Sequence, residues 1–231
     1  MDTATAGRGG PFGWARGAAR AHTAAWWRRV RARCATAESS PSGSGRRRLT
    51  LVVTVLALGG VASMGSGAWL YAKAIAGQWM LERAWADTRE GRPVRPWPWA
   101  DTYPVARLIV PSVEGEVLVL AGASGRTLAW GPGHLDASAP LGSAGNAVVT
   151  AHRDTHFRFL KGVVPGDEIV VELADGARRH YRVRNRYVAD VSTLQLPRTT
   201  IVPTLTLVTC WPFDAVVPGG PGRLVVVAEA G

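Results

Sequence analysis

The longest apolar stretch of the chain runs from Leu49 to Ala72 and contains no charged residue. Its 24 positions exceed the ~20 that a helix needs to cross the hydrocarbon core of a bilayer. A buried helix of a soluble domain seldom needs so long a run, and the charged leader before it is unusually long for a cleaved signal peptide. We therefore predict a transmembrane signal anchor over residues 49–72.

The pattern then changes from helical to extended. From Tyr71 to about Glu90, apolar and charged residues recur at helical spacing, which predicts a helix leaving the membrane. The four prolines of Gly91–Pro104 exclude a helix or a central strand in that segment. We expect Trp97 and Trp99 of this linker to pack on the domain that follows.

After the linker the pattern is that of short strands. Seven β-rich runs are separated by turn residues: Ala106–Val110, Glu116–Leu120, Ala147–Ala151, Glu168–Leu173, His180–Val188, Leu205–Thr209 and Arg223–Ala228. Asp175-Gly176 is typical of a hairpin turn. Such runs without long helical intervals predict an all-β domain, either a closed barrel or a sandwich. The chain thus divides into a tail (1–48), a membrane anchor (49–72), a juxtamembrane helix with a Pro/Trp-rich linker (73–104) and a β domain (105–231).

Charge is distributed unevenly along the chain. The 231 residues carry 27 Lys and Arg against 17 Asp and Glu, a net charge of +10. Residues 1–48 hold ten of the arginines and only Asp2 and Glu38 as acidic residues, so we predict a basic, disordered, cytoplasmic tail. The rest is nearly neutral, which leaves nucleic-acid binding with no support outside the tail. The arginines at 46–48, against the single Lys73 after the span, predict a cytoplasmic N-terminus and an exported β domain.

The chain has only two cysteines, which excludes a disulfide-stapled scaffold. Cys34 falls on the cytoplasmic side of the predicted span, so Cys210 is the lone thiol of the exported domain. It ends a predicted strand just before Pro212, and strand ends that open into loops are where scaffolds present reactive groups. A buried structural cysteine explains the same pattern equally well.

A nucleophilic thiol needs a base, because a free thiol with a pKa of about 8.5 is mostly protonated at neutral pH. His152 ends the apolar run Asn146–Ala151 in the way that Cys210 ends its own strand, which favours this imidazole as the partner. His134, in a turn, and His180, among arginines, are expected to face solvent.

His152 and His156 also have a spacing that can hold zinc on a helix. The protease version of that motif needs Glu after the first histidine, and here the position is Arg153, so a metal site is disfavoured. We expect Asp154 instead to cap a short turn or helix over residues 155–160.

Acyl transfer requires in addition a donor for the oxyanion of the tetrahedral intermediate. Arg223 opens the last predicted strand, and a guanidinium stays charged at all working pH values. Taken alone, such a residue is more often an ordinary surface arginine.

The order of these three groups resembles the sortase family. A histidine at a strand end is followed by Thr-Leu-Val-Thr-Cys at 206–210 and then by an arginine that opens the next strand. The resemblance extends over residues 97–228. Four segments resemble the Gram-negative branch, class GN: Pro96–Thr102, Gly131–His134, His152–Leu160 and Thr209–Asp214. Ala151 departs from the pattern, since many members carry glycine there, but an alanine leaves the imidazole available.

This resemblance implies an eight-stranded sortase β-barrel that performs transpeptidation. In the family's scheme, Cys210 attacks the Thr carbonyl of a Leu-Pro-x-Thr-Gly-like sorting signal. His152 protonates the departing amine and later deprotonates the incoming one, while Arg223 steadies the substrate or the oxyanion. Thr209 and Trp211, on either side of the cysteine, are expected to bind substrate.

The resemblance also implies the partners and the location. The substrate would be an exported protein with a C-terminal LPXTG-like sorting signal, and the acceptor would be an amine. We expect no cofactor, no metal and no nucleic acid. The chain would cross the inner membrane once, with its catalytic domain in the periplasm.

Three other functions fit parts of the pattern. L,D-transpeptidases also combine Cys, His and Arg, but they use a Ser-His-Gly-Cys arrangement that this sequence lacks. Papain-like peptidases place Cys before His, whereas here His152 precedes Cys210. A non-catalytic, membrane-anchored β-barrel scaffold with a buried Cys210 is the alternative outside enzymes.

Overall fold

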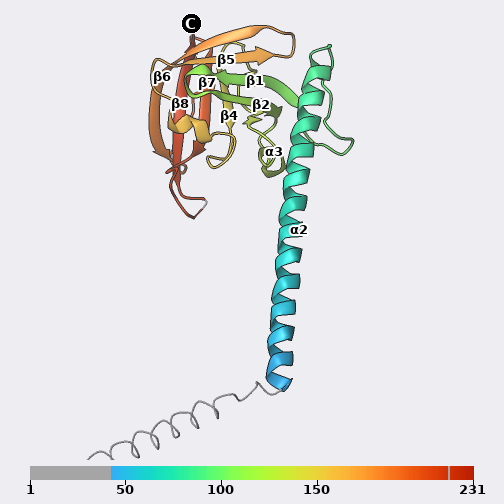
Figure 1. The fold of residues 1–231 in the computed structure, drawn as a ribbon. Coiled ribbons are helices and arrows are strands. Elements are labelled where there is room, and N and C mark those ends of the chain that lie inside the picture. The colour runs from blue at the N-terminus through green and yellow to red at the C-terminus, as the bar shows by residue number, and fades with distance from the viewer. Residues whose placement is uncertain (1–42, 218) are drawn as a thin grey trace, which may run out of the picture. The chain divides into compact units, whose positions relative to one another are not determined.

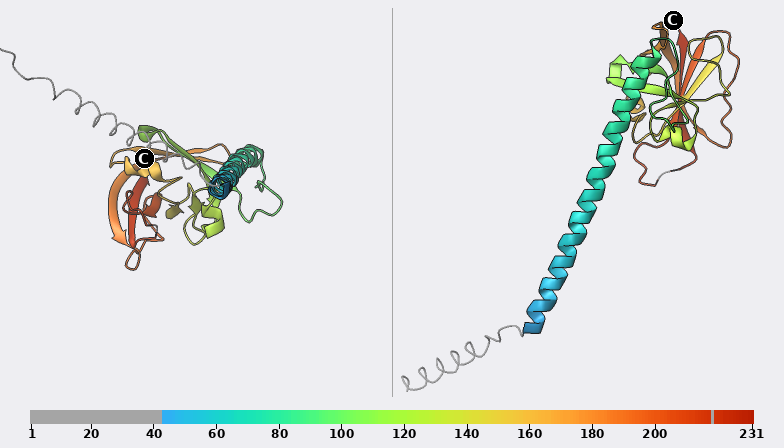
Figure 2. Two further views of the ribbon diagram at one scale, coloured as in Figure 1. Left: turned by 60° about the horizontal axis from the view of Figure 1, so that its bottom comes forward. Right: turned by 90° about the vertical axis from the view of Figure 1, so that its right-hand side faces the viewer.

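The computed structural model describes residues 43–217 and 219–231. Within them the chain forms one long helix and a closed β-barrel (Figure 1), and Figure 2 shows the barrel from two further directions. The prediction of a disordered tail lies outside the described residues as far as residue 42. Residues 43–48, assigned to the same tail, are helical instead, because arginine is a good helix former and a helix that has started continues over such residues.

The helix α2 runs without a break over Gly43–Thr88 and has 46 residues. It therefore contains both the predicted span and the predicted juxtamembrane helix. Its most apolar 18-residue window has a mean hydropathy of 1.8 and is 0% buried, so α2 is long and apolar enough to cross a membrane. The last turns of α2 belong to the compact unit Ala68–Gly231, which also holds the barrel.

Eight strands close into the barrel in the order β1-β2-β3-β4-β7-β8-β6-β5. Their bounds are β1 Pro104–Val110, β2 Gly115–Ala121, β3 Gly133–His134, β4 Asn146–Thr150, β5 Glu168–Leu173, β6 Arg178–Asp190, β7 Thr204–Cys210 and β8 Gly222–Ala230. The expected all-β barrel of eight strands is confirmed, and the sandwich is excluded. The short β3 was not predicted, because a Gly-Pro-Gly-His segment has no strand pattern of its own.

Alternate residues of the strands fill the barrel. Six aliphatic side chains at its centre are 0% exposed: Leu108, Val119, Val149, Val171, Leu207 and Val226. Since successive side chains of a strand point to opposite faces, Val149 and Leu207 fix the inward positions of β4 and β7. The even-numbered residues of these two strands therefore face outward.

Three short helices connect the strands: η1 Pro111–Val113, α3 Gly125–Leu128 and η2 Arg158–Lys161. The prediction that Asp154 caps the last of these is wrong. The residue before η2 is Phe157, without a side-chain cap, and Asp154 Oδ1 instead accepts a hydrogen bond from Arg153 Nε at 3.1 Å.

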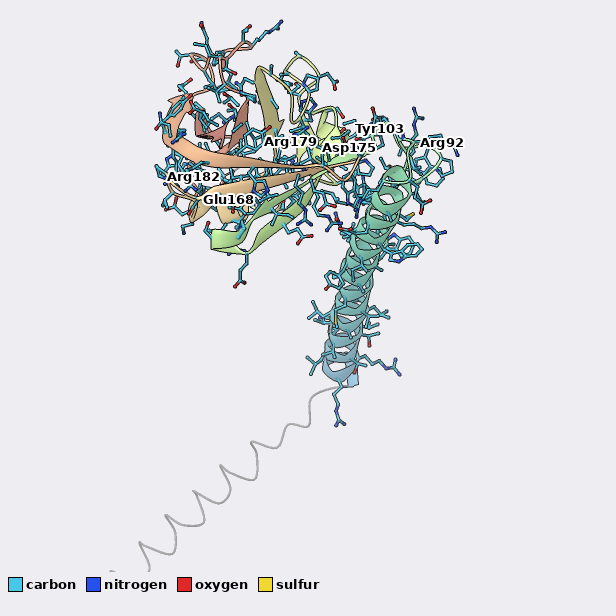
Figure 3. The ribbon with its side chains drawn as sticks, turned by 90° about the horizontal axis from the view of Figure 1, so that it is seen from above. Arg92, Tyr103, Glu168, Asp175, Arg179 and Arg182 are labelled. Atoms are coloured by element: carbon cyan, nitrogen blue, oxygen red, sulfur yellow. The ribbon has the colours of Figure 1, made fainter. Side chains whose placement is uncertain are left out.

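The β5–β6 hairpin carries charges on its outer face. Glu168 lies opposite Arg182 in the register, while Asp175 and Arg179 lie at the other end of the hairpin (Figure 3). His180 Nδ1 is 2.8 Å from Glu168 Oε1, and the His180 side chain is 56% exposed. The prediction that His180 faces solvent is confirmed.

The prediction for His134 is wrong. This residue belongs to β3 and is half-buried. Its Nε2 lies 2.8 Å from the carbonyl oxygen of Ala139 and 3.2 Å from the Ser138 hydroxyl. Because β3 pairs with both β2 and β4, His134 is enclosed by its neighbours instead of turning to water.

The last turns of α2 pack against the barrel. Leu81 and Trp85 form a buried cluster with two leucines of β2. Gly77 allows the closest approach, since a Cβ at this position would lie 2.1 Å from the Trp130 ring. A larger residue at 77 would therefore push the helix and the barrel apart.

The tryptophans of the linker behave differently from each other. Trp97 packs on Trp130 with ring centroids 4.8 Å apart, which confirms the prediction for Trp97. Trp99 is 81% exposed, so the prediction for Trp99 is wrong. A turn closed by the Ala100 N–H and the Trp97 carbonyl, at 3.0 Å, reverses the chain and directs Trp99 outward.

Candidate active site

His152 follows directly after the pairing of β4 with β7. The two strands are parallel neighbours, with Thr150 opposite Val208. The Ala151 N–H extends the pairing by donating to the Val208 carbonyl at 3.2 Å. By this register we expect His152 to come near Cys210, the last residue of β7, although the recorded pairing stops before both residues.

Arg223 lies on the other side of the cysteine. β7 and β8 are antiparallel neighbours, and Cys210 and Arg223 are direct partners in their register. Directly opposed residues of neighbouring strands lie about 5 Å apart and point to the same face. Since Leu207 and Leu224 point into the barrel core, Cys210 and Arg223 point outward. His152 follows β4 and is exposed.

The candidate nucleophile and base are accessible to different extents. Cys210 is half-buried and not in a disulfide, whereas His152 is exposed. The His152 carbonyl accepts a hydrogen bond from the Phe157 N–H at 3.1 Å, which closes a turn behind the imidazole. The thiol is therefore not sealed in the core, and the imidazole is free to approach a ligand from solvent.

Arg223 has local partners in this structure. Its Nη1 donates to the carbonyl oxygens of Gly220 at 2.6 Å and Gly222 at 2.8 Å. Arg223 also lies close enough to Asp190 of β6 to affect its ionisation. The pKa of Asp190 is lowered mainly by hydrogen bonds from Ser192 and secondarily by the charge of Arg223. The guanidinium is thus restrained beside Cys210 by backbone oxygens that it would have to exchange for those of a ligand.

The two residues that flank Cys210 take different positions. Thr209 is 1% exposed, and its hydroxyl donates to the Ala151 carbonyl at 2.8 Å, so this side chain joins β7 to β4. Trp211 is half-buried and packs edge-on against Phe213, with ring centroids 5.8 Å apart. Substrate binding by either residue stays a prediction, and the Thr209 hydroxyl already has a structural partner.

Sequence reasoning missed the role of Arg153. It entered only as the residue that stands where a zinc protease has glutamate, but its side chain is 3% exposed. The guanidinium reaches the loop between β7 and β8, where it donates to the carbonyl oxygens of Pro212 and Ala215. Nothing in the sequence distinguishes this buried arginine from the exposed Arg158 five positions later.

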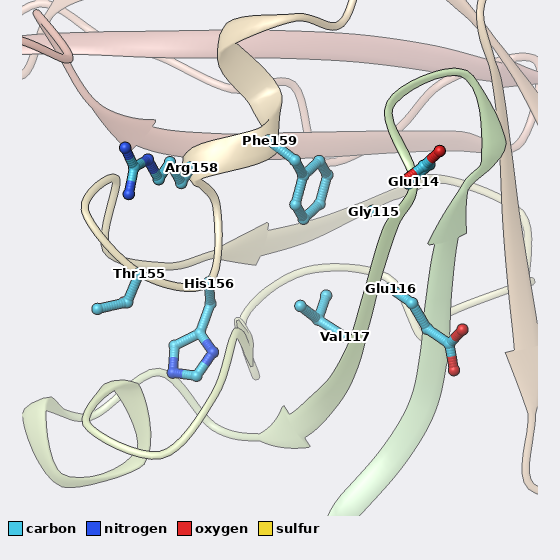
Figure 4. Close-up of a pocket in the computed structure, with 8 residues that line it drawn as sticks. All are labelled: Glu114, Gly115, Glu116, Val117, Thr155, His156, Arg158 and Phe159. Atoms are coloured by element: carbon cyan, nitrogen blue, oxygen red, sulfur yellow. The ribbon is translucent and has the colours of Figure 1, made fainter. Parts of the chain in front are cut away.

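His156 lines a cavity of about 470 Å³ beside the same turn (Figure 4). The cavity lies between this turn and the start of β2, and Phe159 and Val117 form its apolar part. Burial, and secondarily the charge of His152, lower the pKa of His156. Among the described residues, no three His, Cys, Asp or Glu side chains are grouped to hold a metal ion.

A second cavity, of about 560 Å³, lies on the outer face of β4, β7 and β8. Thr206 and Val227 form part of its floor, and residues of the segment 196–202 border it. Asn146, 1% exposed, fixes that segment, because its Nδ2 donates to the Pro197 carbonyl at 2.9 Å. This groove lies on the outer face of β7, toward which Cys210 also points, and its lining on β7 ends at Thr206, four residues before the cysteine.

Comparison with known proteins identifies this arrangement. The family model "Sortase domain" matches residues 108–230. Sortase D of Bacillus subtilis (strain 168) is 28% identical over 126 residues, which are 53% of this chain and 61% of that protein. The chain thus spans about three fifths of the length of the curated relative that it matches.

Solved structures agree with the family match. Sortase A from Corynebacterium diphtheriae superposes with a TM-score of 0.52 at 28% sequence identity, covering 58% of this chain and 63% of that one. A Clostridium perfringens sortase D5 transpeptidase superposes with a TM-score of 0.55, covering 68% of this chain and 98% of that one; at 18% identity it supports the fold alone. With its barrel and more than half of its length matched by the family, this chain belongs to the sortases.

Proposed function

We propose that the protein is a membrane-anchored cysteine transpeptidase. It cleaves an LPXTG-like sorting signal between Thr and Gly and transfers the acyl group to an amine. The observation that carries this proposal is the register of β7 and β8, in which Cys210 lies opposite Arg223. The pairing of β4 with β7, which ends at Thr150 and Val208, leads toward His152 and Cys210 on the two strands and supports the third member of the site. A thiol, an imidazole and a guanidinium at one strand end are the groups that acyl transfer requires.

The reaction has two halves. The Cys210 thiolate attacks the Thr carbonyl carbon, and the resulting tetrahedral intermediate collapses as the Thr–Gly C–N bond breaks. His152, as the imidazolium, gives its proton to the departing Gly amine and leaves a thioester. An incoming amine then attacks the thioester, His152 takes the proton that this amine loses, and the thiolate departs; water in place of the amine gives hydrolysis.

Arg223 serves the charged intermediate in this proposal. The guanidinium is held on the cysteine side of β8 by the Gly220 and Gly222 carbonyls. Exchange of one of these neutral acceptors for an oxyanion is favourable, because a guanidinium attracts a full negative charge more strongly than it attracts a carbonyl dipole. Arg223 therefore binds the substrate carbonyl most tightly when that carbonyl carries negative charge.

The sorting signal binds in the groove bordered by residues 196–202. The groove lies on the same outer face as Cys210, and its floor is part of β7, so a peptide laid along it reaches the cysteine at the end of that strand. The thiol is the point at which such a peptide would be cleaved.

The proposed location follows from α2. This helix is long and apolar enough to cross a membrane, and the arginines at 46–48 favour a cytoplasmic N-terminus. The barrel then works outside the cytoplasm on exported proteins. Membership of the Gram-negative branch, and with it the inner membrane and the periplasm, stays a prediction.

A thiol-reactive probe tests the pair directly. The full chain in detergent, with Cys34→Ser to leave one thiol, is treated with iodoacetamide and compared with the same chain carrying His152→Ala. We expect rapid labelling of Cys210 in the native protein and slow labelling without the imidazole. A cysteine that reacts only after denaturation would instead support the non-catalytic scaffold.

A further inference from the structure

Arg153 is buried beside the candidate site although it is charged. Its side chain is 3% exposed, and removing a guanidinium from water is costly unless its donors are all paired. Its one carboxylate partner, Asp154, is 62% exposed and accepts from Nε at 3.1 Å. Lys161 and Arg158 line the adjacent cavity, so the surrounding charge does not favour another cation.

Backbone carbonyls of a single loop take up the other donors. Nη1 donates to Pro212 O at 2.5 Å, and Nη2 donates to Ala215 O at 2.8 Å and to Val217 O at 3.5 Å. All three carbonyls belong to the segment that follows Cys210 and leads to β8. One side chain thus connects the turn that carries His152 with the loop that follows the cysteine.

This connection lies where the strand pairing ends. The last hydrogen bonds between the β4 and β7 segments involve Ala151 and Thr209. His152 and Cys210 are the next residues along these two segments. Beyond the last ladder bond, nothing in the strand pairing fixes the distance between an exposed imidazole and a half-buried thiol. The Arg153 side chain supplies the next link.

We propose that Arg153 is a positioning residue. Its hydrogen bonds hold residues 212–217 against the turn that carries His152, and we call this connection the clasp. The clasp keeps the imidazole aligned with the Cys210 thiol. The consequence for catalysis rests on the function proposed above, whereas the clasp itself does not. Arginine suits this task because its planar fork presents five donors in fixed directions, while a lysine ammonium offers one compact charge.

Hydrogen exchange tests the clasp without reference to activity. We compare the full chain in detergent with Arg153→Met and, as a matched control, with Arg158→Met, which removes an exposed charge from the same cavity lining. In Arg153→Met we expect amide exchange over residues 213–217 to accelerate by about tenfold or more, with the barrel strands unchanged. Arg158→Met should exchange like the parent. Unchanged exchange in Arg153→Met would overturn the clasp.

Alkylation tests the positioning. In a Cys34→Ser background, we measure how much His152→Ala slows the reaction of Cys210 with iodoacetamide, with and without Arg153→Met. We expect His152→Ala to slow the reaction by about tenfold or more with Arg153 present, and by less than about twofold in Arg153→Met, because the imidazole is no longer aligned. An equal effect of His152→Ala in both backgrounds would overturn the positioning role, since a purely structural defect changes both rates alike.

A third variant keeps both tests decisive. Arg153→Lys retains the charge and part of the donor set. It replaces Arg153→Met in both measurements if the methionine variant unfolds. We expect its exchange rates and its response to His152→Ala to lie between those of the parent and those expected for Arg153→Met. If His152→Ala has no effect even with Arg153 present, the Cys–His pair of the proposed function fails and the positioning role with it. Hydrogen exchange still decides in that case whether Arg153 holds the loop.

Discussion

At the scale of single residues, the candidate site depends on side chains that share one face of the sheet. Cys210 and Arg223 do so because they are direct partners of an antiparallel pair. We expect His152 to join them because it follows β4, which pairs in parallel with β7 as far as Thr150 and Val208. The Arg223 guanidinium already donates hydrogen bonds to the backbone carbonyls of Gly220 and Gly222. Its geometry, and not only its charge, should therefore matter for turnover.

Arg223→Lys tests this requirement. One ammonium cannot hold a backbone carbonyl and an oxyanion at the angles that a planar fork provides. We expect kcat/KM for a sorting-signal peptide to fall about a hundredfold, as is typical when an oxyanion donor is lost, with unchanged thermal unfolding. Activity near that of the parent would reduce Arg223 to a structural role.

The sequence predicts which candidate site residues lie at strand ends. It does not predict which distant groups the adjacent residues bind. His152, Cys210 and Arg223 were selected because each borders an apolar run. The contacts of Arg153 and Thr209 could not be predicted, because their partners are carbonyls 59 and 58 positions away. Local patterns carry no information about contacts over such a distance.

At the scale of elements, the segment between β6 and β7 is held by one buried amide. Asn146 Nδ2 donates to Pro197 O at 2.9 Å, its N–H donates to Arg198 O at 3.2 Å, and its Oδ1 accepts from the Thr206 hydroxyl at 2.7 Å. The groove proposed for the sorting signal is bordered by this segment, so the amide links the core of β4 to the binding face.

Asn146→Ala should loosen that segment. The variant leaves the buried Thr206 hydroxyl and the Pro197 carbonyl without partners, and each such loss costs about 1–3 kcal/mol. We expect a lower free energy of unfolding and a higher KM for peptide, measured by urea denaturation and steady-state kinetics. The exposed Asn185→Ala is the matched control and should change neither. An unchanged KM in Asn146→Ala would separate the segment from substrate binding.

The turn after β4 should make stability depend on pH. Burial, and then the charge of His152, lower the pKa of His156 below its usual 6.5. As the pH falls through 6.5 the unfolded chain takes up a proton that the folded one refuses, so the free energy of unfolding decreases down to the lowered pKa and levels off below it.

Urea titrations between about pH 7.5 and pH 5 check this dependence. We expect His156→Gln to lose less stability over that range than the parent does. A parallel loss in His156→Gln and the parent would show that His156 does not cause the dependence.

Elements were easier to predict than their junctions. Seven strands follow alternating or continuous apolar runs, and such runs determine strands locally. The short β3 exists only because β2 and β4 lie on either side of it. In the same way, the predicted boundary between span and juxtamembrane helix vanishes in α2, because a charged residue such as Lys73 does not interrupt a helix.

At the scale of the whole molecule, one helix contains the candidate membrane span and packs its last turns against the sortase barrel. Gly77, Leu81 and Trp85 attach its last turns to the barrel, so the barrel is coupled to the helix by packing as well as by the chain. In the function proposed above, this attachment would connect the barrel to its membrane anchor.

The central claim is that Cys210 carries the acyl group between donor and acceptor. The most direct test incubates the full chain with an extract of exported proteins and identifies covalent adducts by mass spectrometry of the intact protein and its peptides. We predict a thioester on Cys210 to a peptide ending in threonine, absent from Cys210→Ala and released by an added amine. An extract that yields no adduct on Cys210, or an adduct that persists in Cys210→Ala, would contradict the account.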